Sequence, residues 1–431
     1  MPTSRRSFFK LYLSHVAKNQ TIMQPCPGDE SIFSEVTASM AAHDVNCKVD
    51  LERWIRDFSL IDAEHQRILS SSMRETFDGV ALAIAANQRL LDAIVSIVDE
   101  RFVPCAHELG SERLQSAARI GGVINHDKCC GTLRQFAREW SASGALERQS
   151  SFGPLLFHLN AAHAGLDAAH RARVRVLVPG SGLGRLMWEV CKCGFSCEGN
   201  EFSYHMLLGC SFALNHFARA EEFSIQPWAG GVSNHVTLAD RLLQVAVPDE
   251  VPALPNEDIR MSMVAGEFCE VYSGMPSMFD VVCTCFFVDT APDALDYIAT
   301  IYATLKDGGL WLNHGPLMYH FEGGSDADEW RRPCVYLTHE QLLECVRSKG
   351  FDIVHVQASQ QPSLYTSAPK SITVHLCTPY LLDLTILSDA TLARWRDGRT
   401  TRSCLLQLSG GSSSSRRRSV KGLMKGGDHM I

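Results

Sequence analysis

One segment constrains the fold of this chain more than any other: an apolar run, Val176–Val178, leads through three glycines into an amphipathic stretch beginning near Arg185. The glycines are Gly180, Gly182 and Gly184. Glycine lets the backbone turn sharply and approach a ligand closely, and the first amides of the following helix point at that ligand. A tight turn without a ligand is the alternative, because a single glycine motif is weak evidence. The segment predicts a strand–loop–helix unit that cradles a nucleotide.

The spacing of the glycines indicates which nucleotide is bound. Gly184 follows Gly182 by two residues, whereas the dinucleotide fingerprint needs three so that a pyrophosphate can lie over the helix. The shorter spacing suits S-adenosylmethionine, which has no phosphate. Its ribose hydroxyls need a carboxylate about 20 residues downstream, at the end of the second strand. Glu201 is well placed for this role, and Glu198 is its rival.

Two further acids follow predicted strands. Glu267 could accept a hydrogen bond from the adenine amino group, with Phe268 packed against the ring, or it could be an ordinary strand-end turn acid. Asp289 follows the apolar run Val281–Val288. It is therefore predicted at the carboxyl edge of the sheet, where open α/β sheets bind their ligands.

The types and spacing of residues divide the 431-residue chain into three regions. Residues 29–165 show the helical spacing of apolar side chains, as at Leu90, Leu91 and Ile94. Residues 166–400 alternate short Val-, Ile- and Phe-rich runs with helical stretches, which indicates βα units around a parallel sheet. We predict an α/β fold with a seven-stranded, doubly wound, Rossmann-like core and a helical N-terminal region. The predicted strands are Val174–Val178, Phe195–Cys197, Met261–Val264, Phe279–Cys285, Leu310–Asn313, Ile353–Val356 and Ile372–Leu376.

Both ends of the chain are basic. Residues 1–28 are expected to be a disordered or frayed terminus, with a weak transit peptide as the alternative. Residues 401–431 are too polar to pack and are expected to be a disordered basic tail. Within that tail, Arg416–Arg418 could be a nuclear address or simply a solvated charge run. We expect a cytoplasmic protein, with the nucleus as a second location.

Composition excludes several classes of function. The formal net charge is −8, which argues against nucleic acid or an anionic membrane as the main partner. No uncharged apolar stretch reaches the length of a membrane span. The 16 cysteines follow no secretory signal, so we expect reduced, intracellular thiols. We expect no metal, because Cys191, Cys193 and Cys197 lack a fourth partner at finger spacing.

Five separated blocks share a resemblance: Leu133–Ser141, Val176–Leu186, Gly199–Ser203, Cys285–Ala291 and Gly315–Phe321. Together they resemble the carnosine N-methyltransferase family. The resemblance implies a class I methyltransferase core with a helical N-terminal elaboration. It also implies that S-adenosylmethionine methylates the imidazole of a histidine-containing dipeptide, so that carnosine becomes anserine.

By this resemblance Gln135 and Arg138 contact the cofactor, and an arginine can bind its carboxylate through paired hydrogen bonds. On residue type alone, these two side chains would form an ordinary polar helix face beside Trp140. The expected cofactor-binding residues are Gln135, Arg138, Gly180, Gly182, Gly184, Glu201, Glu267 and Cys285.

The expected substrate residues are Asp289, His320 and Tyr365, of which the first two are expected to be catalytic. A carboxylate on one ring nitrogen fixes the imidazole tautomer and stabilises the imidazolium that forms. Asp289 could instead cap the helix that contains Leu295, and His320 could be a packed core residue.

Beyond Tyr365 the chain departs from the family, whose relatives carry a tyrosine-rich strand where this sequence reads Ser371–His375. The substrate could therefore be another histidyl dipeptide or a histidine on a protein. A catalytically silent cofactor-binding module is the third reading. A homodimer stays open, since the helical surfaces could serve folding or self-association.

Overall fold

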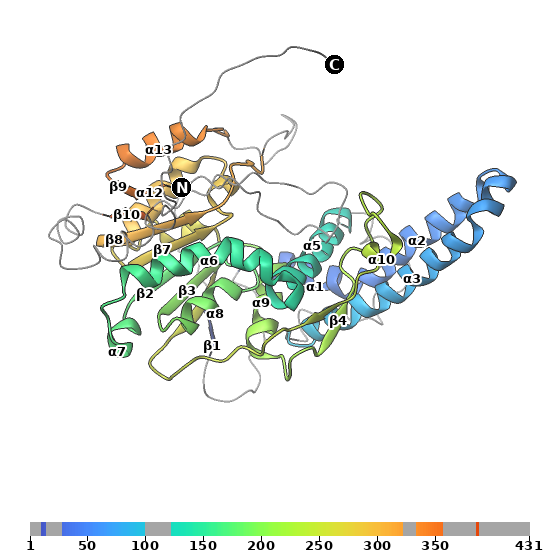
Figure 1. Ribbon diagram of the computed structural model, residues 1–431, viewed down its shortest axis with the longest axis horizontal. Helices are drawn as coiled ribbons and strands as arrows, with labels where there is room; N and C mark the ends of the chain where they lie inside the picture. The colour runs from blue at the N-terminus through green and yellow to red at the C-terminus, as the bar shows by residue number, and fades with distance from the viewer. Residues whose placement is uncertain (1–9, 14–27, 100–121, 322–332, 357–384, 388–431) are drawn as a thin grey trace, which may run out of the picture.

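A central eight-stranded sheet organises the structure (Figure 1). The computed structural model describes residues 10–13, 28–99, 122–321, 333–356 and 385–387. The spatial order of the strands is β1-β6-β3-β2-β7-β8-β10-β9, and β6, β3, β2, β7 and β8 run parallel. The strands are β1 (Lys10–Leu13), β2 (Arg175–Pro179), β3 (Ser196–Glu201), β6 (Met261–Ala265), β7 (Phe279–Cys285), β8 (Leu305–His314), β9 (Asp352–His355) and β10 (Thr385–Leu387). The predicted α/β class with a parallel core is confirmed.

The outer strands differ from the sequence-based expectation. Six of the seven predicted strands have counterparts in β2, β3, β6, β7, β8 and β9, whereas Ile372–Leu376 lies outside the described residues. The antiparallel position between β8 and β9 is taken by β10. We expected residues 1–28 to be frayed, but Lys10–Leu13 forms β1 and pairs antiparallel with β6. The edge of β6 offers unpaired backbone groups, which an extended segment can bond.

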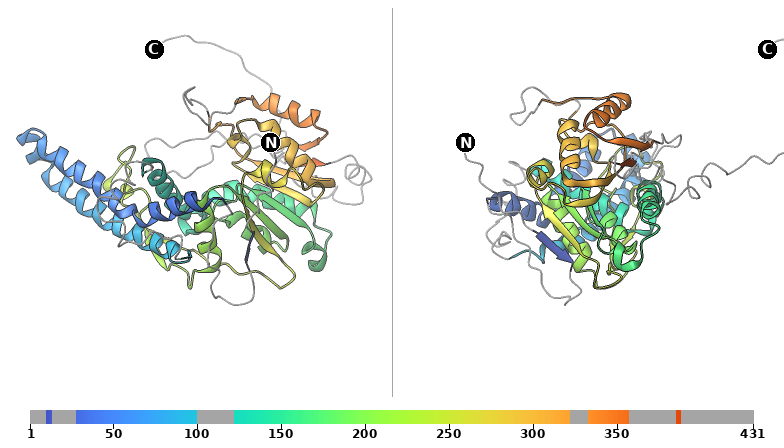
Figure 2. Two further views of the ribbon diagram at one scale, coloured as in Figure 1. Left: turned by 180° about the vertical axis from the view of Figure 1, so that it is seen from behind. Right: turned by 90° about the vertical axis from the view of Figure 1, so that its left-hand side faces the viewer.

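Each face of the sheet is covered by helices, as Figure 2 shows. Val176 and Val178 point into one core and Leu177 into the other, because alternate side chains of a strand face opposite ways. Strands buried on both faces read as continuous apolar runs. The first core includes residues of α6 (Ala145–Ala162), α8 (Arg185–Lys192) and α9 (Tyr204–Asn215), and the second includes residues of α11 (Phe268–Tyr272), α12 (Ala294–Thr304) and α13 (His339–Ser348).

The predicted helical N-terminal region is present. It consists of α1 (Glu30–Ala41), α2 (His43–Leu60), α3 (Ala63–Val95) and α5 (Gly122–Trp140). Leu90, Leu91 and Ile94 are fully buried, as their spacing predicted, and α2 and α3 form a hairpin that projects from the sheet (Figure 1). None of the described helices combines the length and apolar character that a membrane crossing requires. The short elements are α7 (Ala168–Arg171), α10 (Leu238–Arg241), the 3-10 helices Ala142–Gly144 and Val288–Thr290, and the hairpin of β4 (Phe223–Ile225) and β5 (Val245–Val247).

A buried ionic cluster ties the helical region to the sheet. Asp249 accepts hydrogen bonds from Arg185 at 2.6 Å and from Arg148 at 2.7 Å. Arg185 also bonds the carbonyl of Glu139 at the end of α5, and its guanidinium carbon lies 5.0 Å from the ring centre of Trp140. The cluster therefore joins α5, α6 and α8 around one carboxylate.

Replacing Asp249 with alanine should lower the free energy of unfolding by about 3–5 kcal/mol, because two largely buried guanidinium groups would lose their shared carboxylate. Urea unfolding of the full chain measures this. Arg53→Ala, which breaks the exposed pair with Asp50, is the control and should change stability by less than about 1 kcal/mol. Equal, small losses in both variants would contradict a structural role for the cluster.

Candidate active site

The loop between β2 and α8 holds three glycines in the left-handed backbone region. Their φ angles are +64° at Gly180, +55° at Gly182 and +82° at Gly184, values that residues with a side chain rarely adopt. Space is equally restrictive. A Cβ atom on Gly180 would lie 2.6 Å from the ring of Phe287, and one on Gly182 would lie 2.7 Å from Oε1 of Glu139. Both the turn and its surroundings therefore require glycine.

Glu201 turns its carboxylate toward this loop from the end of β3. Its Oε2 atom accepts the backbone N–H of Gly182 at 3.0 Å. Its Oε1 atom accepts the backbone N–H groups of the two residues that follow Glu201, each at 2.9 Å. Burial raises the pKa of Glu201, and these N–H bonds oppose the shift. The rival Glu198 instead accepts the hydroxyl of Tyr272 at 3.0 Å. The carboxylate beside the loop is thus that of Glu201.

Helix α5 brings a second carboxylate to the loop, which the sequence analysis did not single out. The side chain of Glu139 is buried; it accepts the side-chain amide of Gln135 and, at 3.1 Å, the backbone N–H of Arg185. Burial raises the pKa of Glu139. Gln135 and Glu139 both border the space that a side chain on Gly182 would need. One turn of α5 therefore forms a polar wall of the glycine loop.

Arg138 lies on the same helix and reaches the end of β7. Its Nε atom is 2.7 Å from a carboxylate oxygen of Glu147, and its guanidinium carbon lies 5.0 Å from the ring centre of Phe286. Burial raises the pKa of Cys285 to about 12, and the positive charge of Arg138 opposes this shift. Because Arg138 is only 7% exposed, the alternative of an ordinary polar surface is wrong for this residue.

Aromatic side chains form another wall of the loop. The rings of Phe287 and Tyr297 are stacked with centres 4.5 Å apart, and burial raises the pKa of Tyr297 to about 12, with the charge of Glu267 adding to it. Glu267 also caps α11, since it accepts the N–H of Glu270 at 2.7 Å. The expectation that Phe268 packs against a bound ring is wrong, because its side chain is 2% exposed within the core.

Asp289 is buried in the short helix that follows β7. Its Oδ2 atom accepts the backbone N–H of Met318 at 3.0 Å, and its carbonyl accepts that of His320 at 3.2 Å. The alternative that it caps the next helix is wrong, because Asp293 caps α12 by accepting the N–H of Leu295 at 2.9 Å. Asp289 is therefore held beside the segment that carries His320.

His320 is exposed, so the alternative of a packed core histidine is wrong. Burial raises the pKa of Asp289, and the nearby imidazole of His320 opposes this shift. Two residues beside the pair hold left-handed backbones although they carry side chains, with φ +54° at Phe286 and +34° at Tyr319. Strain of this kind concentrates where function fixes the backbone.

The glycine loop and the residues around Asp289 adjoin each other through Phe287, which precedes Asp289 by two residues and whose ring lies 2.6 Å from the place of a Cβ on Gly180. The sequence matches a known family. A sequence model described as carnosine N-methyltransferase matches residues 116–380. The chain belongs to the carnosine N-methyltransferase family.

Individual carnosine N-methyltransferases are similar over much of the chain. The enzyme of Schizosaccharomyces pombe is 44% identical over 235 residues, which cover 53% of this chain and 62% of the relative. That of Rattus norvegicus is 32% identical over 320 residues, which cover 73% of this chain and 76% of the relative. Among solved structures, the phosphoethanolamine N-methyltransferase 2 of Haemonchus contortus in complex with S-adenosyl-L-methionine is 16% identical with a TM-score of 0.32, covering 57% of this chain and 46% of that one.

In this member of the carnosine N-methyltransferase family, most of the expected site residues fall into two neighbouring groups, and Glu267 caps α11. Gly180, Gly182, Gly184, Glu201 and Gln135 surround the glycine loop. Arg138 and Cys285 lie at the end of β7, next to the loop that carries Asp289. Tyr365 lies outside the described residues. The added residue is Glu139, which lies within the block Leu133–Ser141 and on the same helical face as Gln135, four residues away.

Proposed function

We propose that this chain is an S-adenosylmethionine-dependent N-methyltransferase that methylates the imidazole of carnosine or a related histidyl dipeptide, giving anserine from carnosine. The observation that carries the proposal is the buried carboxylate of Asp289, next to a glycine loop that has its own carboxylate, Glu201. Membership of the carnosine N-methyltransferase family supports the choice of substrate.

The residues around the loop fit S-adenosylmethionine. Gly180 and Gly182 form a left-handed turn without side chains, so the loop offers bare backbone for close approach of a ligand. Glu201 would accept the ribose hydroxyls. Arg138 would pair with the carboxylate of the cofactor, and the acidic Glu139 complements its ammonium group. When bound, the cofactor supplies a methyl group on a positively charged sulfur.

Asp289 would act on the substrate imidazole. Its carboxylate would accept the N–H of one ring nitrogen, which leaves the other nitrogen neutral and nucleophilic. The carboxylate would stabilise the imidazolium that the substrate becomes when it takes up the methyl group. The imidazolium then gives its N–H proton to Asp289, whose pKa is raised by burial. His320 is exposed beside it and would pass the proton to solvent.

Incubation of the full chain with methyl-labelled S-adenosylmethionine and a panel of histidyl dipeptides tests the proposal. Carnosine should gain one methyl group by mass spectrometry, and proton spectra should show a single ring isomer. Label appearing only in proteins of an added lysate would replace the dipeptide with a protein histidine. Cofactor binding with no transfer to any acceptor would instead indicate a silent binding module.

The kcat/KM for the dipeptide should fall as the pH drops through about 6.5, the ordinary pKa of an imidazole, even when cofactor is saturating. A protonated imidazole has no free electron pair for attack. Asp289 must also be ionised, and its raised pKa means that acid protonates it sooner than an ordinary carboxyl. Protonation of the imidazole and protonation of Asp289 therefore both lower the rate as the pH falls. A kcat/KM for the dipeptide that is flat from about pH 5 to 8 would contradict an imidazole acceptor.

A further inference from the structure

Away from the proposed active site, two helices each present a histidine and a cysteine four residues apart. Helix α2 carries His43 and Cys47, and α5 carries His126 and Cys130. This spacing puts both side chains of a pair on one helical face. The two faces meet, because α2 packs on α5 and the rings of His43 and His126 are stacked with centres 5.4 Å apart.

Donor atoms of three of these residues are mutually close, and Cys47 adjoins them through His43. Ligand atoms of His43, His126 and Cys130 all lie within 4.8 Å of one another. The Sγ atom of Cys130 is 3.8 Å from Nε2 of His126, and that of Cys47 is 3.5 Å from Nε2 of His43. Donors around a tetrahedral zinc ion with bonds of about 2.0–2.3 Å are roughly 3.3–3.8 Å apart. The spacing within each pair already matches that of such a site.

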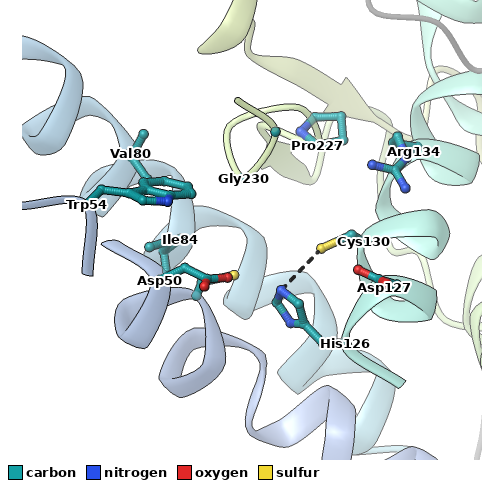
Figure 3. A pocket seen from close by; sticks show the side chains of 12 residues that line it. Asp50, Trp54, Val80, Ile84, His126, Asp127, Cys130, Arg134, Pro227 and Gly230 are labelled. Atoms are coloured by element: carbon teal, nitrogen blue, oxygen red, sulfur yellow. Dashed lines mark hydrogen bonds between the residues drawn. The ribbon is translucent and has the colours of Figure 1, made fainter. Parts of the chain in front are cut away.

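Two further observations point to a ligand at the cluster. Nδ1 of His126, the ring nitrogen other than the one near Cys130, is buried and has no hydrogen-bond partner within the part of the chain that the structure describes, so no protein group there fixes the imidazole on that side. A pocket of about 230 Å³ reaches Cys47, His126 and Cys130 and is also lined by Asp50 and Arg134 (Figure 3). Figure 3 shows His126 and Cys130 projecting from one helix toward the side that carries Asp50. The pocket provides an entry path for an ion.

We propose that His43, Cys47, His126 and Cys130 bind a zinc ion between α2 and α5. A set of two imidazoles and two thiolates favours the binding of zinc over that of calcium or magnesium. Four protein ligands occupy all positions around a tetrahedrally coordinated ion and leave none for a substrate. The ion would therefore hold α2 and α5 together. Our sequence-based expectation of no metal rested on finger spacing, whereas these ligands follow helical spacing on two separate segments.

Elemental analysis of the full chain, expressed with zinc in the medium and freed of any affinity tag, tests the site. We expect about one zinc per chain. The double variant Cys47→Ser/Cys130→Ser should lose at least about tenfold in zinc content. Cys129→Ser is the matched control: Cys129 adjoins the cluster in sequence but its Sγ lies against Ser39, 3.5 Å from that hydroxyl, so this variant should keep its zinc.

A measurement on the unaltered chain makes the test independent of how the variants fold. Cobalt added to metal-stripped protein should produce the charge-transfer absorption of thiolate ligands, and zinc should abolish it. Metal-stripped protein that shows no such absorption after cobalt is added would overturn the proposal. Zinc that stays bound in the folded double variant would overturn it too, by placing the ion elsewhere. Neither outcome depends on methyl transfer.

Discussion

Replacing Asp289 with asparagine should lower kcat by about a hundredfold or more while cofactor affinity stays near that of the unaltered chain. The amide oxygen can still accept the N–H of Met318, so the loop keeps its hydrogen bond. What disappears is the negative charge that stabilises the imidazolium and takes up its proton. Calorimetry with S-adenosylmethionine and steady-state rates with carnosine separate the two quantities.

Asp293→Asn is the matched control for this experiment. Asp293 lies four residues away and caps α12, and asparagine is about as good a helix cap as aspartate. This variant should therefore turn over at a near-normal rate. Near-normal turnover in Asp289→Asn as well would show that Asp289 has a structural role only.

Replacing Gly182 with valine should weaken S-adenosylmethionine binding by about a hundredfold or more, equivalent to about 2.7 kcal/mol. A β-branched residue resists a φ of +55°, and its Cβ would lie 2.7 Å from Glu139. The change therefore moves the loop or fills the space beside it. Calorimetry measures the affinity, and circular dichroism reports whether the fold persists.

Two other variants sharpen this experiment. Glu201→Ala leaves the glycine backbone unstrained, and it should still weaken binding by about tenfold or more, because a charged hydrogen-bond acceptor is lost. Gly153→Ala on α6 is the control, since a Cβ there meets no atom within 4 Å, and its cofactor affinity should not change. Unchanged affinity in both Gly182→Val and Glu201→Ala would remove the cofactor site from this loop.

The parts of the site that the sequence predicted are those set by local chain geometry. The turn at Gly180, Gly182 and Gly184 and the acid at Glu201 belong to one βαβ unit, in which strand length and turn shape decide where the residues lie. Glu139 was not predictable in this way. It bonds the backbone of Arg185, 46 residues away in sequence, and helical periodicity says only that it is a polar residue near Trp140.

Asp289 illustrates a different limit. Its sequence context suits a helix cap and a catalytic acid equally, and the competing cap Asp293 is only four residues away. The two readings separate only when the backbone path is known, because the segment around Met318 must return to the end of β7 before Asp289 can bond it. Long-range contacts of this kind leave no periodic mark in either segment.

The contacts between α5 and the glycine loop limit how this protein can be divided into fragments. Gln135 and Glu139 wall the glycine loop from outside the sheet, and Glu139 bonds the first amide of α8. A fragment starting at residue 166 would contain every strand from β2 onward yet expose the loop to water and leave Arg185 without the backbone carbonyl of Glu139. The boundary at residue 165 is thus not a line along which the protein can be cut into independent modules. We expect the nucleotide pocket to form only when the helical region and the sheet are both present.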